Sequence, residues 1–312
     1  MIKVVIIGYG HLGRWHLDKA LSFANVEVIG VVDPSEITSV LLKDRNIDVD
    51  VYSSLDEVID KIDAAFVVTP TSLHFDIIIK LLENNKHVFC EKPMTSTFEQ
   101  AVKVKELLTS KSVVFQVGHS ERFHNVWSQV RDLKQYFTKT SHISIERQAM
   151  FKGRATDVDV VQDLMIHDLD LVLFLLEEKP SKVSAIGYKI RTENWDYVKA
   201  TLSFPSGKSA QIVSGRNYTK EVRTFEVMGP IGCISVDLFR NNISLAPSDS
   251  TNDHVVESQY EKRDHLLEEH KHFYNSIENG QPAIVDINAG CAAVLLVSKV
   301  LESLEKSSEV VL

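Results

Sequence analysis

The N-terminal part of the chain, up to His119, alternates between short apolar runs and helical segments, and this alternation restricts the fold more than any other feature. Apolar runs occupy residues 2–8, 26–33, 63–70, 87–93 and 113–119. Continuous apolar runs are typical of parallel strands that are buried on both faces. Strands that alternate with helices imply right-handed crossovers. The sequence therefore predicts an α/β fold that begins with a doubly wound parallel sheet.

After His119 the pattern changes, which predicts a first domain over 1–119 and a second over 120–312. The second domain is expected to be α+β, with a large open, mostly antiparallel sheet and C-terminal helices with room to pack back on the first domain. The expected elements are helices around 123–137 and 162–176, a strand around 141–150, consecutive strands over 181–245, a loop over 246–262, and helices at 264–279 and 288–306. These helices suffice for one face of the sheet only. The other face is therefore predicted to contact a partner subunit in a homodimer or homotetramer.

Charge and composition narrow the class of protein. The 312 residues carry a net charge of −9, which argues against a general nucleic-acid binder. No run of 18 apolar residues and no signal peptide is recognised, so no membrane insertion is expected. The three cysteines are far apart and do not form a metal-binding pattern, so no metal is expected. Together these features predict a cytoplasmic protein.

The segment IIGYGHLGRWH contains the pattern GxGxxG at Gly8, Gly10 and Gly13, directly after a strand and at the start of a helix. In this context the pattern is typical of dinucleotide binding. Gly8 permits the tight turn, Gly10 lets a pyrophosphate approach the backbone, and Gly13 lets helix and strand pack closely. His11 and Leu12 begin the helix, whose free N–H groups are suited to phosphate. The alternative is a glycine-rich turn without a ligand.

Asp33 ends the second strand, where a carboxylate accepts hydrogen bonds from the ribose hydroxyls of NAD and repels the 2′-phosphate of NADP. NAD is therefore the expected cofactor and NADP the less favoured one, although Asp33 could also act as a helix cap. Thr69 and Pro70 end the strand at 63–70, at the edge where ligands bind in such sheets. His74 either faces the same crevice or has a structural role.

Two further segments carry ionisable side chains in apolar surroundings. Glu91 and Lys92 end a buried strand, and a Lys at that depth is costly unless it is paired or functional. On the helix QDLMIHDLDLVLFLL, Asp163, His167 and Asp170 are spaced to share one stripe, whereas Asp168 is not. Asp163 can orient His167 for proton transfer. The alternatives are an ordinary surface Lys and an Asp–His–Asp cluster that satisfies itself internally, and Asp170 is assigned a structural rather than a catalytic role.

With GxGxxG at 8–13, TPTSLH at 69–74, EKP at 91–93 and the D-x-x-x-H of Asp163 and His167, the chain resembles the Gfo/Idh/MocA oxidoreductases over its whole length. The resemblance implies a Rossmann domain followed by an α/β domain whose open sheet forms a dimer interface. It also implies that Lys92, Asp163 and His167 surround the nicotinamide ring and the substrate, and that Thr69, Pro70, His74 and Glu91 contribute to the cofactor site.

The resemblance is to the nucleotide-sugar branch of that family, which includes UDP-N-acetylglucosamine 3-dehydrogenases. The chain departs from the common family pattern at Met165, where many members have Gly, and from the branch at His124 and Asn125, where Asn and Pro are usual. The implied reaction is oxidation of C3 of a UDP-N-acetyl-hexosamine to the 3-keto sugar, in a route to cell-surface polysaccharide or lipid A. Either His167 or Lys92 would be the base.

The substrate-binding residues expected from this reading are basic. Arg122, Lys152 and Arg154 are candidates for the diphosphate or for the rim of the cofactor site, with a solvated surface charge as the alternative for each. Two other functions remain open on the sequence. One is a dehydrogenase of inositol or free sugars in the same family, and the other is an NAD-binding regulator without turnover.

Overall fold

A computed structural model describes residues 1–138, 141–153, 155–248 and 255–312. The chain divides into two compact units, of which the first contains Met1–Phe123 and Asp264–Val294, and the second His124–Arg263 and Leu295–Leu312. The first unit is thus built from two separate stretches of the chain. The division into a cofactor-binding domain over 1–119 and a second domain over 120–312 stays a prediction. Spatial clustering groups residues 264–294 with the N-terminal stretch.

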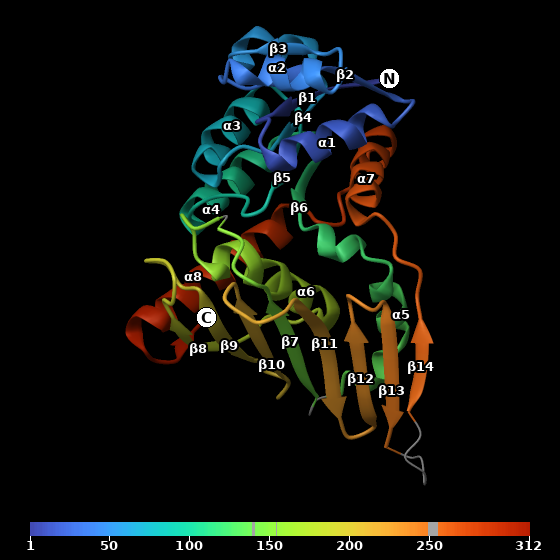
Figure 1. Cartoon of the computed structure of the whole chain (residues 1–312), viewed down its shortest axis with the longest axis vertical. Helices are drawn as coiled ribbons and strands as arrows, with labels where there is room; N and C mark the ends of the chain where they lie inside the picture. The colour runs from blue at the N-terminus through green and yellow to red at the C-terminus, as the bar shows by residue number, and fades with distance from the viewer. Residues whose placement is uncertain (139–140, 154, 249–254) are drawn as a thin grey trace. The chain divides into compact units, whose positions relative to one another are not determined.

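The first unit contains a six-stranded parallel sheet in the order β3-β2-β1-β4-β5-β6 (Figure 1). Its strands are β1 (Ile2–Ile7), β2 (Val26–Val32), β3 (Asp50–Tyr52), β4 (Ala64–Val67), β5 (His87–Glu91) and β6 (Phe115–Gly118). Its helices are α1 (His11–Leu21), α2 (Ile37–Asp44), α3 (Thr71–Glu83), α4 (Phe98–Leu108) and α7 (His265–Asn279). The predicted doubly wound sheet is confirmed, and β3 is an additional edge strand of only three residues, too short to show a pattern in the sequence.

Both faces of this sheet are covered. One hydrophobic core contains Ile78 and Leu81 of α3 and Val104 of α4, and the other contains Leu17 of α1 and Phe273 of α7. All four residues of β4 and all four of β6 are buried, as expected for a sheet between two helical layers. In open sheets of this kind, ligands bind in the crevice outside the carboxyl ends of the strands.

The second unit contains a nine-stranded sheet in the order β14-β13-β12-β11-β7-β10-β9-β8-β15. All neighbours are antiparallel except β7 and β10, so the sheet is mostly antiparallel as predicted. The strands are β7 (His142–Gln148), β8 (Lys182–Tyr188), β9 (Tyr197–Ser203), β10 (Ser209–Gly215), β11 (Val222–Gly229), β12 (Gly232–Asp237), β13 (Asn242–Pro247), β14 (Val256–Gln259) and β15 (Val310–Val311). β14 lies inside the stretch 246–262, which was expected to be a loop. The strand was not predicted because its four residues are all exposed and apolar residues do not alternate with polar ones.

The helices of the second unit differ from expectation in two places. The segment expected to be one helix over 162–176 begins with a π-helical turn, Val161–Met165, and continues as α6, Ile166–Leu176. The segment expected over 123–137 contains only α5, Val126–Asp132, flanked by short 3₁₀ turns. A π turn holds more residues than an α turn and is frequent at functional sites, so uniform α-helical spacing does not apply around Asp163.

The last helix, α8 (Ile287–Lys306), belongs in its first part to one unit and in its second part to the other. By length and composition alone it is apolar enough to cross a membrane, but 56% of the apolar window is buried inside the protein. A core helix has the same composition.

Candidate active site

The glycine-rich turn has the backbone geometry of a dinucleotide-binding loop. Gly8 has a φ of +96°, and a Cβ there would lie 2.8 Å from the carbonyl oxygen of Val68. A Cβ on Gly13 would lie 2.0 Å from the carbonyl oxygen of Gly8, so helix and strand can approach only without a side chain. A Cβ on Gly10 would meet nothing within 4 Å. The loop is therefore closed against the protein at Gly8 and Gly13 and open at Gly10, where the fingerprint places a pyrophosphate.

The start of α1 presents free backbone donors next to this loop. His11 and Leu12 are exposed, and Gly10 precedes them without a side-chain cap. The first N–H groups of a helix have no partner within the helix and attract anions. No acidic residue occupies the first turn, so nothing there repels a phosphate. This structure fits the predicted phosphate contacts of His11 and Leu12.

Asp33 follows β2 and accepts two backbone hydrogen bonds. The N–H of Tyr9 donates to Oδ2 at 2.7 Å, and the N–H of Ser35 donates to Oδ1 at 2.9 Å. Asp33 thus ties the glycine-rich turn to the loop after β2. Each carboxylate oxygen has further acceptor capacity, so this capping role and the predicted ribose contact are compatible.

Thr69, Pro70 and His74 form the next loop at the carboxyl edge. Both ring nitrogens of His74 lie near carbonyl oxygens, with Nε2 2.8 Å from Thr69 and Nδ1 2.9 Å from Pro93. Burial lowers the pKa of His74, although these hydrogen bonds oppose the shift. His74 therefore braces two loops from the inside. The buried hydroxyl of Thr69 has no hydrogen-bond partner among the described residues, which leaves it available for a cofactor.

Glu91 and Lys92 end β5 at the same edge. The carboxylate of Glu91 is buried, with Oε1 3.0 Å from Nε2 of His16, and Oε2 accepts the backbone N–H of Lys92 at 3.1 Å. Burial opposes the charged form, but the hydrogen bond from His16 and the charges of His16 and Lys92 outweigh it and lower the pKa of Glu91. Glu91 thus fixes the backbone at Lys92 while its carboxylate lies in the protein interior.

In the second unit, Asp163 lies in the π-helical turn and His167 in the first turn of α6. Asp163 lines a cavity of about 230 Å³. Basic side chains share this lining, namely Arg147, Lys152, Arg216 and Arg223. The cavity therefore combines one carboxylate from the predicted set with several cations.

Sequence reasoning named only Lys152 among these cations. Lys152 forms an ion pair with Glu221 at 2.7 Å, and Arg154 lies outside the described residues. Arg122, in the first unit, donates to the carbonyl of Ile284 at 3.4 Å. The alternation of side chains along β7 could have indicated that Arg147 faces the protein interior, because Arg147 occupies the same face as the buried Ile143 and Ile145.

Arg147 also explains the ionisable residue that did not fit the polar stripe. Its guanidinium binds Asp168 of α6 in a bidentate pair, with N–O distances of 2.8 and 2.6 Å. Asp168 is 1% exposed. This pair anchors α6 to β7, so Asp168 has a structural role in holding the helix that carries His167.

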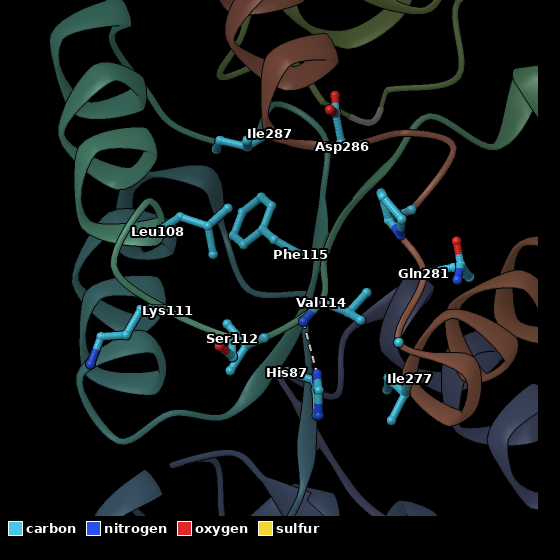
Figure 2. A pocket seen from close by; sticks show the side chains of 14 residues that line it. His87, Leu108, Lys111, Ser112, Val114, Phe115, Ile277, Gln281, Asp286 and Ile287 are labelled. Atoms are coloured by element: carbon cyan, nitrogen blue, oxygen red, sulfur yellow. Dashed lines mark hydrogen bonds between the residues drawn. The ribbon is translucent and has the colours of Figure 1, made fainter.

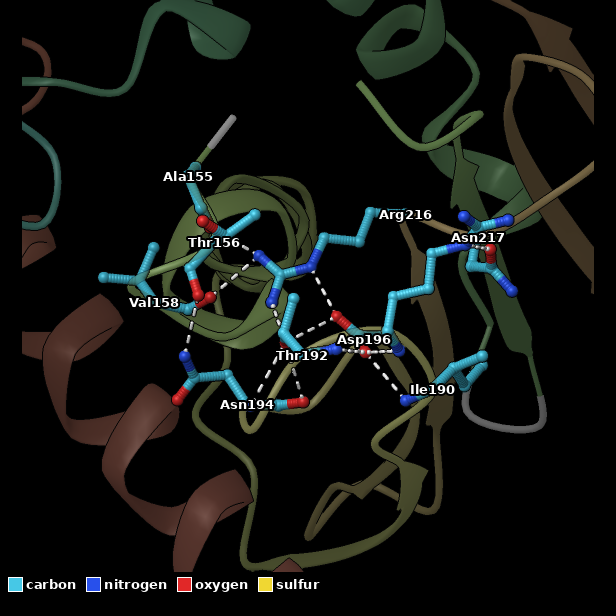
Figure 3. Close-up of polar contacts among 10 residues, drawn as sticks. Ala155, Thr156, Val158, Ile190, Thr192, Asn194, Asp196, Arg216 and Asn217 are labelled. Atoms are coloured by element: carbon cyan, nitrogen blue, oxygen red, sulfur yellow. Dashed lines mark hydrogen bonds and ion pairs between the residues drawn. The ribbon is translucent and has the colours of Figure 1, made fainter. Parts of the chain in front are cut away.

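A second buried pair fixes the segment that leads into the π turn (Figure 3). Arg216 donates to Asp196 at 2.7 Å and also to the carbonyls of Ala155 and Val158. Asp196 further accepts three backbone N–H groups, from residues 190, 191 and 192. Burial opposes its charge, but these hydrogen bonds lower its pKa far below the usual range. Arg216 and Asp196 therefore hold the approach to Asp163 in one conformation.

A larger cavity of about 520 Å³ lies elsewhere in the first unit (Figure 2). His87 and Phe115 line it, and these are the first residues of β5 and β6. It is thus at the amino edge of the sheet, where Nδ1 of His87 accepts the N–H of Val114 at 2.9 Å. None of the predicted site residues lines it. The predicted site residues of this unit instead follow or end β1, β2, β4 and β5 at their carboxyl ends.

Comparison with known proteins agrees with this geometry. Residues 2–119 match the model of the oxidoreductase family with an NAD-binding Rossmann fold, and residues 129–235 match the GFO/IDH/MocA C-terminal domain. The chain is 29% identical to UDP-N-acetylglucosamine 3-dehydrogenase of Acidithiobacillus ferrooxidans, over 97% of this chain and 98% of that protein. It is 26% identical to scyllo-inositol 2-dehydrogenase (NAD(+)) of Bacillus subtilis, over 92% and 90%.

Solved structures give the same result. The Acidithiobacillus ferrooxidans enzyme superposes with a TM-score of 0.88 over 98% of each chain. Scyllo-inositol dehydrogenase from Lactobacillus casei, solved with NAD(H) and scyllo-inositol, superposes with a TM-score of 0.84 at 21% identity, over 100% of this chain and 99% of that one. The second likeness shows the fold alone. With both family models matched in order, the chain belongs to the Gfo/Idh/MocA family of NAD-binding oxidoreductases.

Proposed function

We propose that this protein oxidises C3 of a UDP-N-acetyl-hexosamine to the 3-keto sugar with NAD, in the cytoplasm and in a route to cell-surface polysaccharide or lipid A. The observation that carries the proposal is the 29% identity to a UDP-N-acetylglucosamine 3-dehydrogenase over nearly the whole of both chains. The cation-lined cavity beside Asp163 supports it, because a diphosphate requires positive partners.

The reaction removes a hydride from the carbon and a proton from its hydroxyl. When bound, NAD accepts the hydride. Lys92 or His167 takes the proton, and Asp163 orients His167. Glu91 holds the backbone of Lys92 through its N–H, and Arg147 with Asp168 holds the helix of His167. A positioned base contributes about 10²–10⁴-fold to such a rate.

Lys92→Met and His167→Ala test the assignment of the base. Each substitution is expected to lower kcat at least about tenfold while NAD still binds, because only the proton acceptor is lost. The measurement is NADH formation from UDP-N-acetylglucosamine, with NAD binding followed by protein fluorescence. An unchanged kcat in Lys92→Met would remove Lys92 from the proton transfer.

Gly10→Ala tests the cofactor loop. A Cβ at Gly10 would meet no protein atom within 4 Å, so the stability of the protein should not change. A pyrophosphate that approaches this backbone would meet the new methyl group, so the affinity for NAD should fall at least about tenfold. Unchanged NAD affinity in a stably folded variant would exclude the loop as the phosphate site.

Asp33→Ser tests the preference for NAD over NADP. Loss of the carboxylate removes both the ribose contact and the repulsion of a 2′-phosphate, so the ratio of the two affinities should shift toward NADP. A relative named scyllo-inositol 2-dehydrogenase (NADP(+)) in Bacillus subtilis is 27% identical, so the family accommodates both cofactors. An unchanged ratio would leave Asp33 with its capping role alone.

The second candidate is a dehydrogenase of inositol or free sugars, favoured by the similarity to scyllo-inositol 2-dehydrogenase. A panel of nucleotide sugars, free sugars and inositols, each assayed for NADH formation, separates the two. Faster turnover of an inositol than of any nucleotide sugar would select the alternative. No turnover of any compound, with NAD bound, would select an NAD-binding regulator.

The exposed face of the nine-stranded sheet is proposed to form the interface of a homodimer or homotetramer. Along β9 and β10, buried residues alternate with half-buried ones, so one face is covered within the chain and the other is not. Light scattering at micromolar concentration should give a mass of at least two chains. A monomer of 35.2 kDa would contradict the proposal.

A further inference from the structure

The cavity beside Asp163 lies wholly within the second unit, and several strand ends build it. Residues 147–152 lead out of β7, Arg216 follows β10, residues 221–223 lead into β11, and Phe239 lies in the turn between β12 and β13. We refer to the space that these residues line as the Arg223 cavity. Its volume of about 230 Å³ is below the range of about 300–1,000 Å³ that is usual for sites of whole small-molecule ligands. It is therefore suited to one part of a nucleotide sugar.

Two cations of the Arg223 cavity hold the protein together. Arg147 forms its bidentate pair with Asp168 of α6 at 2.8 and 2.6 Å. Arg216 donates to Asp196 at 2.7 Å. In both pairs the carboxylate is almost completely buried, so each guanidinium is fixed in place. Arg147 and Arg216 therefore give the cavity its shape.

Arg223 lies directly opposite Arg147 in the antiparallel pairing of β11 with β7. Opposed side chains share one face of a sheet, with Cβ atoms about 4.5–5.5 Å apart, and like charges in this arrangement are destabilising. Burial lowers the pKa of Arg223 to about 10, so the guanidinium is partly desolvated and still charged at neutral pH. A guanidinium fits phosphate oxygens with two parallel hydrogen bonds. An anionic group in the cavity would thus offset the repulsion between the two strands.

Lys152 is the second cation that a ligand can use. Its ammonium lies 2.7 Å from Oε1 of Glu221, and the two side chains are 50% and 33% exposed. Exposed pairs of this kind contribute little to stability, so a ligand with a higher negative charge can replace the carboxylate. Both residues line the cavity, which means that Glu221 occupies the cation and also repels an incoming anion.

The lining also includes exposed apolar side chains. Phe239 is 53% exposed and Met150 48% exposed, which places both at the mouth of the cavity. The backbone N–H of Phe239 donates to Oδ1 of Asp237 at 2.9 Å, so the turn that carries the ring is held in place. An exposed aromatic ring is suited to stacking on a planar base. A ring next to two cations matches a nucleoside diphosphate better than a free sugar.

We propose that Arg223 and Lys152 bind the diphosphate of the nucleotide sugar and that Phe239 stacks on its base. Glu221 leaves Lys152 when the ligand enters and thereby weakens binding. The inference rests on the proposed nucleotide-sugar substrate and concerns the part of it that does not react. No covalent bond is made or broken in this step.

Calorimetric titration with UDP and with uridine, both without NAD, tests the proposal. Uridine lacks the diphosphate, so the difference between the two ligands isolates the phosphate contacts. Arg223→Met should lower the affinity for UDP at least about tenfold, as expected for the loss of a hydrogen bond to a charged group, and leave uridine unchanged. Lys152→Met should act in the same direction to a smaller extent. Phe239→Ala should weaken the binding of both ligands.

Glu221→Gln should have the opposite sign. It removes the repulsion and releases Lys152, so the affinity for UDP should rise about threefold while that for uridine stays the same. Loss of a residue with only a structural role does not tighten binding. Arg240→Met is the matched control, because Arg240 is next to Phe239 in the chain but 85% exposed and outside the lining. Its affinity for UDP should equal that of the wild type.

Glu221→Gln and Lys152→Met change partly exposed side chains, so they test the proposal even if Arg223→Met does not fold. Wild-type affinity for UDP in both, or an equal change for UDP and uridine in Lys152→Met, would overturn it. So would a wild-type protein that binds no UDP.

The titrations and the turnover assay fail separately. Affinities that change as predicted, in a protein that oxidises no nucleotide sugar, would support the Arg223 cavity as a nucleoside-diphosphate site and contradict the proposed reaction. Unchanged affinities in an enzyme that oxidises UDP-N-acetylglucosamine would contradict the assignment of the cavity alone.

Discussion

Two of the buried carboxylates of this protein, one in each unit, are held in different ways. Asp196 in the second unit is held by Arg216, by the hydroxyl of Thr192 and by three backbone N–H groups. Glu91 in the first unit is held by an imidazole and one backbone N–H. A guanidinium does not release its proton in a protein, whereas an imidazole does so near neutral pH.

The cation that holds Asp196 therefore keeps its charge, whereas the imidazole that holds Glu91 is of a kind that can change its charge. The Asp196 site has one arrangement of protons, and it fixes the segment before Asp163. Glu91 is held instead by the imidazole of His16, a kind of group that occurs in two protonation states, and Lys92 is the next residue in the sequence. Burial of a carboxylate therefore does not by itself indicate a structural or a catalytic role, and the partner that holds it decides. The following substitutions test this contrast.

Arg216→Met should have the largest effect on stability. It leaves Asp196 buried without its cation and leaves the carbonyls of Ala155 and Val158 without a donor. Breaking a buried pair by removing one partner costs about 3–5 kcal/mol. Urea unfolding followed by circular dichroism measures the loss. Arg240→Met is the control, because Arg240 is largely exposed and 3.7 Å from Asp237, and it should cost less than about 1 kcal/mol. Equal losses in both would show that Asp196 is not an anchor.

Gly118→Ala should have an intermediate effect, and it acts on the other carboxylate. A Cβ there would lie 2.9 Å from the carboxyl carbon of Glu91, which His16 and Lys92 hold in place. Overpacking of this kind costs about 1–3 kcal/mol. The same unfolding experiment measures it, and kcat should fall as well because the backbone at Lys92 shifts. A variant with the wild-type unfolding midpoint and kcat would show that Glu91 is free to move.

Glu269→Gln should have the smallest effect and the opposite sign. The folded-state pKa of Glu269 is raised, so the folded protein retains a proton that the unfolded chain loses above the usual carboxyl range. Stability is therefore lost as pH rises from that range toward the raised pKa, and a glutamine removes the loss. At pH 7 the variant should be more stable than the wild type, with no gain near pH 4. A gain that is equal at both pH values would assign the effect to something other than ionisation.

Asp196 has the reverse dependence on pH. Its folded-state pKa is lowered, so its contribution to stability is fully present above the usual carboxyl range and is lost only as pH falls through the lowered value.

The fold was largely predictable because its signals are local. Apolar runs and the turns between them identify β1, β2, β4, β5 and β6, and the dense alternation in 181–245 identifies the second sheet. β3 and β14 were missed because strands of three and four residues at a sheet edge are too short to show a periodicity. The π turn was missed because an extra residue in one helical turn leaves no mark in the composition.

The parts of the candidate site that consist of short sequence motifs could be predicted. The contacts between side chains that lie far apart in the sequence could not. GxGxxG, EKP and D-x-x-x-H are short patterns. The partnership of His16 with His270 joins residues 254 positions apart, and that of Arg216 with Asp196 joins two loops. Burial of Arg147 was visible in the alternation of β7, but its partner Asp168 was not.

The return of the chain to the first unit at Asp264 affects how that unit can be made and handled. A ribosome releases the six-stranded sheet long before α7, so the nascent sheet lacks the helix that covers Phe66 and Phe89. An N-terminal fragment ending at Phe123 should therefore expose aromatic side chains that favour aggregation, and it should need chaperones to stay in solution. This holds even though the fragment contains the complete GxGxxG motif. Anyone who wishes to isolate the nucleotide-binding half would have to splice residues 264–294 onto it.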